Sequence, residues 1–255
     1  MIGPGLRLGL ILSALLSVGS LYGAEISTQQ IPVVRFITQN FQPFSYIEQG
    51  QVAGPVRALI DSVCQALGQR CEHQLLPWER GQRLVGLGEA EALYVIGWNL
   101  ERSRRLRFSR TLFSTEYGFF VQGDDPLHQL SSEALTGYQV AALKASNTLS
   151  SLRALQQQGH QFEIIEVIDS ESAFRLLSVG RVTAVYSNLE VGQAIIRQLQ
   201  LPELNYALRH RQLEYFVGFN PERVSQAWVD AFNNQLQRLQ QQGEAQKIFK
   251  RYGLQ

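Results

Sequence analysis

Arg102 is the residue of this 255-residue chain best suited to hold an anion. It follows a short apolar run, Leu93–Ile96, which is long enough for a buried strand and is broken by Gly97–Asn99. A guanidinium just beyond a buried strand can give a carboxylate two parallel, charge-assisted hydrogen bonds. The alternative is a solvated basic helix start, because three more arginines stand close by: Arg104, Arg105 and Arg107.

A second basic group occurs in Pro77–Arg80. Arg80 is either a second contact for an anion or a surface residue that pairs with Glu79 or Glu116. Asn99 and Trp98, just before Arg102, add an amide and an aromatic ring near the same predicted strand end.

The composition is that of a globular protein with a large core: 45% of the residues are hydrophobic, 18% are charged, and the formal net charge is +1. This balance gives no basic footprint for nucleic acid. Residues 1–24 read as a signal peptide, with Arg7 before the apolar run Leu8–Val18 and small residues before Glu25. We therefore expect an exported, soluble, periplasmic protein, and the absence of a cysteine near the end of the signal argues against a lipid anchor.

Cys64 and Cys71 are the only cysteines. In an exported chain such a pair predicts a disulfide, with two buried thiols as the alternative. Gly68 is placed to end a helix, so the bond would tie the last helical turn to the next strand. The histidines are scattered, so we expect no metal site and no cofactor; they are His73, His128, His160 and His210.

Apolar periodicity predicts two successive units in which strands and helices alternate, which favours parallel sheets. Gly123–Pro126 separates the units as a turn-rich break and a candidate crossing between domains. In the first unit we predict strands at 33–38, 73–76, 93–96 and 117–121, and helices at 55–67 and 79–87. In the second we predict strands at 140–143, 163–167, 184–186 and 205–208, and helices at 147–158, 170–179 and 189–199.

The chain then passes a polar stretch, 210–212, into a predicted strand at 215–219 and two helices at 225–241 and 244–252. Two units joined by two crossings leave a cleft between them, which is where small-molecule sites usually lie. Loops at the ends of the parallel strands would line that cleft.

Several motifs occur in order along the chain: residues 40–46 with Gly54; Cys64 with Cys71; Glu101-Arg102 before Phe108-Ser109; Asp169 with Ala173, Leu176 and Leu177; Gly180-Arg181-Val182; and a C-terminal amphipathic helix ending near Phe249 and Tyr252. By these motifs the chain resembles, from about residue 33 to residue 252, the family 3 periplasmic solute-binding proteins, which include many amino-acid-binding components of ABC importers. The resemblance implies a type II periplasmic-binding-protein fold, an α/β fold with two lobes. Each lobe would have a mainly parallel sheet with flanking helices, and two hinge strands would join them.

Lobe 1 would comprise residues 25–121 and 213–255, and lobe 2 residues 122–212. By position in the family, Arg102 would grip the carboxylate of the ligand, and Phe41 and Trp78 would flank the rest of it; for the two aromatic residues the alternative is core packing. Ser146 and Asn147 open a predicted helix, where a hydroxyl and free N–H groups favour an anion or serve as a plain N-cap.

Three departures from the family pattern restrict the class of ligand. Asn188 stands where amino-acid binders carry an aspartate for the ligand's amino group, and an amide cannot neutralise an ammonium. Val56 and Ala58 replace acidic residues common in binders of basic amino acids, and Asn99 replaces the usual ligand-binding threonine. The resemblance and its departures together imply a small organic anion with an apolar or aromatic part, or an α-amino acid held unusually. Lysine or arginine is disfavoured.

The resemblance predicts a monomeric receptor, not an enzyme, that captures a carboxylate ligand by closure of its lobes and delivers it to a membrane permease. Two alternatives stay open. Some proteins of this fold are enzymes such as cyclohexadienyl dehydratases, and Glu79, Glu101 or Glu190 would then be the candidate acids or bases. The other alternative is a sensory receptor whose closed form is read by a membrane kinase.

Overall fold

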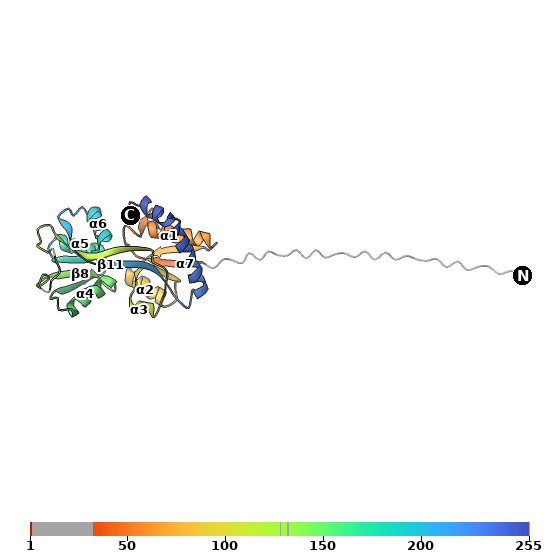
Figure 1. Cartoon of the computed structure of the whole chain (residues 1–255), viewed down its shortest axis with the longest axis horizontal. Coiled ribbons are helices and arrows are strands. Elements are labelled where there is room, and N and C mark those ends of the chain that lie inside the picture. Colours follow the sequence, from red (N-terminus) through yellow and green to blue (C-terminus); the bar gives the residue numbers. More distant parts are fainter. Residues whose placement is uncertain (2–32, 128, 132, 255) are drawn as a thin grey trace. The chain divides into compact units, whose positions relative to one another are not determined.

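In the described residues a mixed nine-stranded sheet forms the centre of the fold (Figure 1). Its strands lie in the order β4 (Cys71–Leu75), β1 (Val34–Thr38), β5 (Ala92–Gly97), β11 (Leu204–Phe219), β7 (Phe113–Gln122), β10 (Ala184–Asn188), β8 (Gln139–Leu143) and β9 (Glu163–Val167), and β6 (Arg107–Phe108) pairs with β11. This computed structural model describes Met1 and residues 33–254 except 128 and 132, and contacts group Ile31–Gln255 into one compact unit. The predicted signal peptide, apart from Met1, lies outside the described residues. No helix in the described part of the chain is long and apolar enough to span a bilayer.

Each lobe contains a parallel group of strands. In the first lobe, β1 pairs in parallel with β4 and with β5; in the second, β8 pairs in parallel with β9 and with β10. Two long strands, β7 (Phe113–Gln122) and β11 (Leu204–Phe219), run antiparallel to each other between the two groups (Figure 1). The predicted α/β class with two joining strands is confirmed.

The elements follow the predicted alternation closely. The first lobe contains β1 (Val34–Thr38), β2 (Tyr46–Glu48), β3 (Gln51–Ala53), α1 (Pro55–Ala66), β4 (Cys71–Leu75), α2 (Trp78–Gly86), β5 (Ala92–Gly97), α3 (Leu100–Ser103) and β6 (Arg107–Phe108). The second contains β8 (Gln139–Leu143), α4 (Asn147–Gln157), β9 (Glu163–Val167), α5 (Ser170–Ser178), β10 (Ala184–Asn188) and α6 (Leu189–Leu199). The chain ends with α7 (Gln226–Gln241) and α8 (Glu244–Arg251).

One prediction is wrong. Two strands separated by a polar break were expected between Asn205 and Phe219, but β11 is continuous through His210–Gln212. This polar stretch stays in the sheet because its backbone pairs with β7, as in Arg211 opposite Tyr117, while its side chains reach solvent. The short hairpin β2–β3 and the single-turn helix α3 were not predicted, because neither has a periodic apolar pattern.

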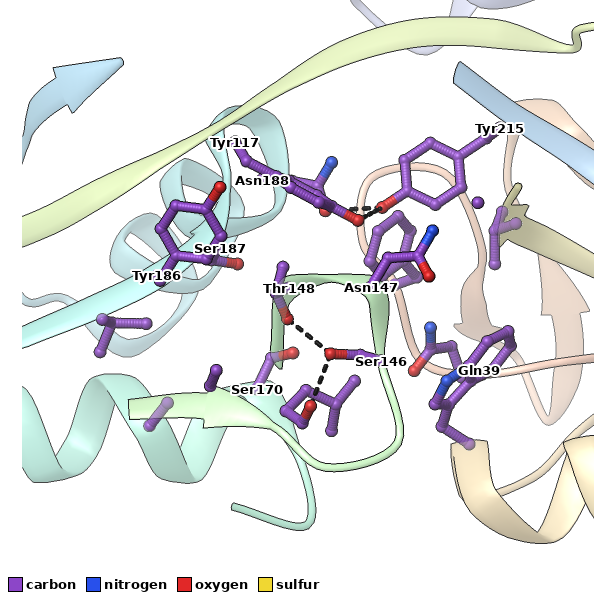
Figure 2. Close-up of a pocket in the computed structure, with 18 of the residues that line it drawn as sticks. Gln39, Tyr117, Ser146, Asn147, Thr148, Ser170, Tyr186, Ser187, Asn188 and Tyr215 are labelled. Atoms are coloured by element: carbon purple, nitrogen blue, oxygen red, sulfur yellow. Dashed lines mark hydrogen bonds between the residues drawn. The ribbon is translucent and has the colours of Figure 1, made fainter. Parts of the chain in front are cut away.

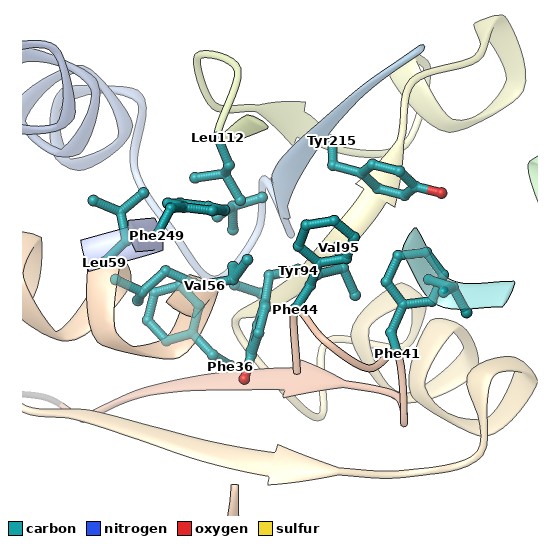
Figure 3. Packing of buried hydrophobic residues seen from close by; sticks show 14 of the residues in the cluster. Phe36, Phe41, Phe44, Val56, Leu59, Tyr94, Val95, Leu112, Tyr215 and Phe249 are labelled. Carbon is teal, nitrogen blue, oxygen red and sulfur yellow. The ribbon is translucent and has the colours of Figure 1, made fainter. Parts of the chain in front are cut away.

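Helix α1 shows how the sequence builds the first lobe. Pro55 occupies its first turn, and Val56, Leu59, Ile60 and Val63 are buried at the spacing of one helix face. Figure 3 shows Val56 and Leu59 packed with Phe36, Tyr94 and Phe249, which come from β1, β5 and α8. Each such fully buried side chain contributes roughly 1.5–3 kcal/mol to folding. The packing holds the first-lobe strands, and so their ends, in fixed positions.

The predicted disulfide is confirmed. Cys64 and Cys71 are bonded, with their Cα atoms 6.3 Å apart. Helix α1 ends at Ala66, and Gly68 follows with φ of 63°, a left-handed conformation that suits glycine after a helix. The bond therefore ties the last turn of α1 to the start of β4.

Candidate functional site

Three helix N-termini of the second lobe converge on one cavity. Strands β8, β9 and β10 end at Leu143, Val167 and Asn188, and a helix begins shortly after each of these ends. Ser146, Asp169 and Asn188 are the N-cap residues of these helices, α4, α5 and α6. Free N–H groups and the helix dipoles make such ends favourable for negative charge.

The cavity lies between these helix ends and the carboxyl ends of the first-lobe strands. Its volume is about 30 Å³, which is room for little more than a water molecule. None of the described residues that line it is an aspartate or a glutamate. They are Gln39, Phe41, Trp78, Val95, Gly97, Arg102, Tyr117, Ala142, Leu143, Ser146, Asn147, Thr148, Ser170, Ala173, Val185, Tyr186, Ser187, Asn188 and Tyr215.

Arg102 is held by neutral acceptors. Its Nη1 donates to the Gly97 carbonyl oxygen at 2.9 Å and to Asn147 Oδ1 at 3.1 Å. Its Nη2 donates to Gln82 Oε1 at 3.1 Å and to the Ala145 carbonyl oxygen at 3.2 Å. Arg102 forms no ion pair with a described carboxylate. Burial lowers its pKa from the usual value, which is the cost of a cation without a counter-ion.

The turn between β8 and α4 connects the two lobes. The carbonyl oxygen of Ala145 accepts hydrogen bonds from Trp78 Nε1 at 3.0 Å, Gln82 Nε2 at 3.1 Å and Arg102 Nη2 at 3.2 Å. Ala145 has φ of 55°, a left-handed conformation that non-glycine residues adopt at a cost. Lys144 also pairs with Glu79, with Nζ and Oε2 3.3 Å apart. Described contacts therefore already bridge the two lobes at this turn.

Ser146 caps helix α4 and also lines the cavity. Its Oγ accepts from the backbone N–H of Leu149 at 3.2 Å and donates to the carbonyl oxygen of Leu143 at 2.5 Å. Figure 2 shows its hydroxyl beside that of Thr148, 2.6 Å away. The N-cap interpretation is thus confirmed, and it is compatible with a role in binding.

Asn188 belongs to a buried network of neutral polar groups. Tyr215 donates its hydroxyl to Asn188 Oδ1 at 2.9 Å and lies 3.1 Å from the hydroxyl of Tyr117 (Figure 2). Asn188 Nδ2 lies 3.5 Å from Thr115 Oγ1, whose hydroxyl donates to Glu190. Burial raises the pKa of Tyr117 to about 12 and that of Tyr215 well above its usual value, so both hydroxyls stay protonated at neutral pH. The members of the network that line the cavity, Asn188, Tyr117 and Tyr215, can offer hydrogen bonds to a ligand but no negative charge.

The aromatic lining comes from both lobes and from the joining strands. The ring of Trp78 lies under Arg102, with the guanidinium carbon 5.6 Å from the ring centroid. Phe41 packs on Tyr215 with ring centroids 5.3 Å apart. The rings of Phe41 and Trp78 line the cavity and are also buried. Core packing is therefore compatible with contact to a ligand at both positions.

Val95 carries local backbone strain at the cavity. Its φ is 54°, which is unusual for a β-branched residue, and it lies where the pairing of β5 with β11 shifts by one residue, between Phe216 and Val217. Such bulges frequently occur next to binding sites because they redirect a side chain. Here the bulge places Val95 in the cavity lining.

Not all of the predicted site residues reach this cavity. Asn99 caps α3 by accepting from the backbone N–H of Arg102, and it donates to Asn147 Oδ1 at 2.8 Å. It therefore positions Arg102 and Asn147 without lining the cavity itself. Trp98 lines a neighbouring groove. Arg80 lines a separate depression beside Lys144 and Ile168. Arg80 pairs with neither of its expected surface partners, since Glu79 pairs with Lys144 and Glu116 with Arg209.

Sequence reasoning missed several polar residues that line the cavity or support Arg102, among them Gln39, Gln82, Tyr117 and Tyr215. Gln39 directly follows β1, and Gln82 lies in α2 and bonds Arg102, but neither position is marked by a motif. Tyr117 and Tyr215 lie on the joining strands, and the pairing of these strands could have indicated them. No group of three metal-ligating side chains occurs in the described part of the chain; His128 lies outside it.

Residues 34–255 match the model of the family described as "Bacterial extracellular solute-binding proteins, family 3". The chain belongs to this family. Its predicted membership is confirmed, and it has a solute-binding role. No curated protein matches the chain by sequence.

Solved structures share the periplasmic-binding-protein fold at low sequence identity. A histidine kinase sensor domain with similarity to periplasmic binding proteins is 20% identical, with a TM-score of 0.79 over 87% of this chain and 96% of that one. An ancestral arginine-binding protein bound to arginine is 18% identical, with a TM-score of 0.77 over 86% and 97%. An amino acid ABC transporter substrate-binding protein from Streptococcus pneumoniae bound to L-arginine is 20% identical, with a TM-score of 0.75 over 86% and 94%.

Proposed function

We propose that this protein is an exported, periplasmic receptor that captures a small carboxylate-bearing ligand between its lobes and delivers it to a membrane permease. One observation carries the proposal: Arg102 faces the cavity with only neutral acceptors around it among the described residues. A carboxylate would supply the counter-charge and replace two of those bonds with a bidentate pair. The N-termini of α4, α5 and α6 favour the same charge.

The cavity also restricts what else the ligand carries. Its described lining holds no acidic side chain, and Asn188 and the two tyrosines offer only neutral groups. An ammonium or guanidinium group would therefore be desolvated here without compensation. We propose an organic anion without a strongly basic group, in contrast to the arginine named for two of the similar structures.

Capture proceeds by closure in this proposal. The ligand docks on the first lobe against Arg102, Trp78 and Phe41, and the second lobe closes over it with Ser146, Asn147 and Asn188. Closure bends β7 and β11, the two strands that join the lobes. The ligand favours the closed state by the difference in its affinity for the two states, and a permease that recognises this state receives it.

One other function is a candidate besides delivery to a permease. The similarity to a histidine kinase sensor domain favours a receptor read by a kinase as the second candidate. Catalysis has less support. Glu79 pairs with Lys144, Glu101 with Arg105, and Glu190 accepts from Thr115, and none of the three glutamates is in the lining. Turnover of prephenate or arogenate by the purified protein would overturn the binding role.

A thermal-shift screen tests the ligand class. Aromatic acids, dicarboxylates and amino acids are compared with their uncharged amides, because a ligand that binds only the folded state raises the melting temperature. We expect acids without a basic group to stabilise the protein and their amides to have no effect. Stabilisation by arginine or lysine, but by no simple acid, would contradict the proposal.

A further inference from the structure

A groove lies next to the central cavity, and two residues line both of them. Its volume is about 670 Å³, against about 30 Å³ for the cavity, and Tyr117 and Asn147 line both. The groove runs between α4, the residues before α3 and the joining strands. Its other lining residues include Trp98, Leu100, Arg211 and Glu214.

One wall of the groove exposes large apolar side chains. Trp98 keeps 54% of its surface exposed and Leu100 keeps 59%, whereas Trp78 in the cavity keeps only 4%. Exposed tryptophan beside a cavity is unusual, because burial of its ring is strongly favourable. A flat apolar group lying against Trp98 and Leu100 would recover that burial.

The charges of the groove do not favour an ionic group. Arg211 and Glu214 line it with opposite signs, and Glu214 accepts a hydrogen bond from Thr111 at 3.0 Å. The other described residues of the lining are neutral. An uncharged group therefore fits the groove better than a second carboxylate.

Asn147 lies between the groove and Arg102, the proposed anchor of the carboxylate. Its Oδ1 accepts from Arg102 and Asn99, and its Nδ2 donates to the carbonyl oxygen of Trp98 at 3.2 Å. The amide lies directly on Gly97, where a Cβ atom would come within 2.4 Å of Nδ2. Asn147 Oδ1 is only a neutral acceptor on the Arg102 guanidinium, so a carboxylate at Arg102 would substitute for it. Rotation of this single side chain would then open the cavity towards Trp98.

We propose that the groove is a second subsite for the same ligand, which is an elongated carboxylate with an uncharged aromatic group at its far end. The carboxylate binds at Arg102, the chain passes Asn147 and Tyr117, and the aromatic group stacks on Trp98. This inference rests on the proposed function, because it assumes the anchor at Arg102. It also explains how a cavity near the size of one water can serve a larger ligand.

Calorimetric titration with two matched acids tests the subsite. The probes are pentanoate and 5-phenylpentanoate, which share the carboxylate and the chain. In the wild-type protein we expect the phenyl group to tighten binding about tenfold or more, from stacking and buried area. Trp98→Ala should remove most of that gain and leave pentanoate affinity unchanged.

Leu87→Ala is the matched control, since Leu87 is 65% exposed and lies outside the groove. The subsite is overturned if the phenyl group adds nothing, if Trp98→Ala leaves its gain intact, or if neither acid binds. Arg102→Ala separates the two proposals. If it abolishes binding of both acids while Trp98→Ala has no effect, the carboxylate anchor stands and only the subsite fails. If it leaves both affinities unchanged, the anchor fails too.

Discussion

The two ends of strand β5 hold opposite kinds of charge. Glu91, just before the strand, is buried and pairs with two arginines: Arg35 Nε is 3.0 Å and Arg223 Nη2 is 2.9 Å from its carboxylate oxygens. Arg102, just beyond the other end, has four bonds to neutral acceptors and no described carboxylate partner. The charge of Glu91 is neutralised by arginines at the first end, whereas the charge of Arg102 has no counter-ion among the described residues at the second.

The same contrast extends along the sheet of the first lobe. The amino ends of its parallel strands carry the Glu91 cluster and the Cys64–Cys71 bond, which fix the chain. The carboxyl ends lead to Phe41, Trp78 and Arg102, which face the cavity. One edge therefore serves stability and the other serves binding, and variants at the two edges should separate the two properties.

Arg102→Ala should have the largest effect, on binding. Removing a charge-assisted pair costs about 2 kcal/mol or more, so a carboxylate ligand should bind at least about 30-fold more weakly. The melting temperature of the free protein should stay nearly unchanged. Titration calorimetry and thermal denaturation measure the two quantities. Arg105→Ala is the control, because Arg105 is exposed and, among the residues that the structure describes, pairs only with Glu101; an equal loss with this variant would refute a specific anchor.

Replacing both Cys64 and Cys71 by serine should lower the free energy of unfolding by about 2–3 kcal/mol, as for a short closed loop. Ligand affinity should change little, because the bond lies at the edge away from the cavity. Urea denaturation and calorimetry of the double variant test this separation. A large loss of affinity in protein that is still folded would contradict it.

Glu91→Gln should lower the free energy of unfolding by about 1–3 kcal/mol, because hydrogen bonds to a charged group are lost. The two arginines are half-exposed and partly screened, which keeps the loss below that of a fully buried pair. Binding at Arg102 should be unchanged. If Glu91→Gln weakened binding as much as Arg102→Ala, the two ends of β5 would not be independent.

The stabilisation by Glu91 should also depend on pH. Burial raises the pKa of this carboxyl, but hydrogen bonds from Arg35 and Arg223 outweigh burial and hold the pKa below its usual value. The stabilisation is therefore complete above the unfolded pKa, about 4.3, and is lost as pH falls through the lower folded value. Denaturation of wild type and Glu91→Gln across this range should show their difference in stability shrinking. A constant difference would mean that the charge contributes nothing.

Ala145→Gly should have the smallest effect. Glycine adopts the left-handed conformation freely but loses more entropy on folding, so the free energy of unfolding should change by less than about 1 kcal/mol. The carbonyl acceptor of Trp78, Gln82 and Arg102 is retained. Chemical denaturation measures the change, and a loss above 2 kcal/mol would show that the Ala145 side chain matters beyond its backbone.

Much of the fold follows from the sequence, because apolar periodicity and helix-ending glycines mark most elements of both lobes. The errors arose where tertiary pairing overrides local pattern. Polar His210–Gln212 was expected to interrupt a strand, yet backbone pairing with β7 keeps β11 continuous. The limits of the lobes remain predictions.

The site was less predictable than the fold. The strand that precedes Arg102 and its family position both predict this residue, whereas family position alone predicts Trp78 and Phe41. All three line one cavity. The neutral network around Asn188 was not foreseen, because Tyr117 and Tyr215 come from distant strands that meet only in the folded sheet.

Calorimetric titration of the wild-type protein with an acid and its uncharged amide tests the central claim most directly. An aromatic carboxylate found in the thermal-shift screen and the corresponding carboxamide differ chiefly in the charge that Arg102 is proposed to bind. We expect the acid to bind at least about 30-fold more tightly than the amide, the same factor that Arg102→Ala should remove. Equal affinity for acid and amide would contradict the role of Arg102 as the carboxylate anchor.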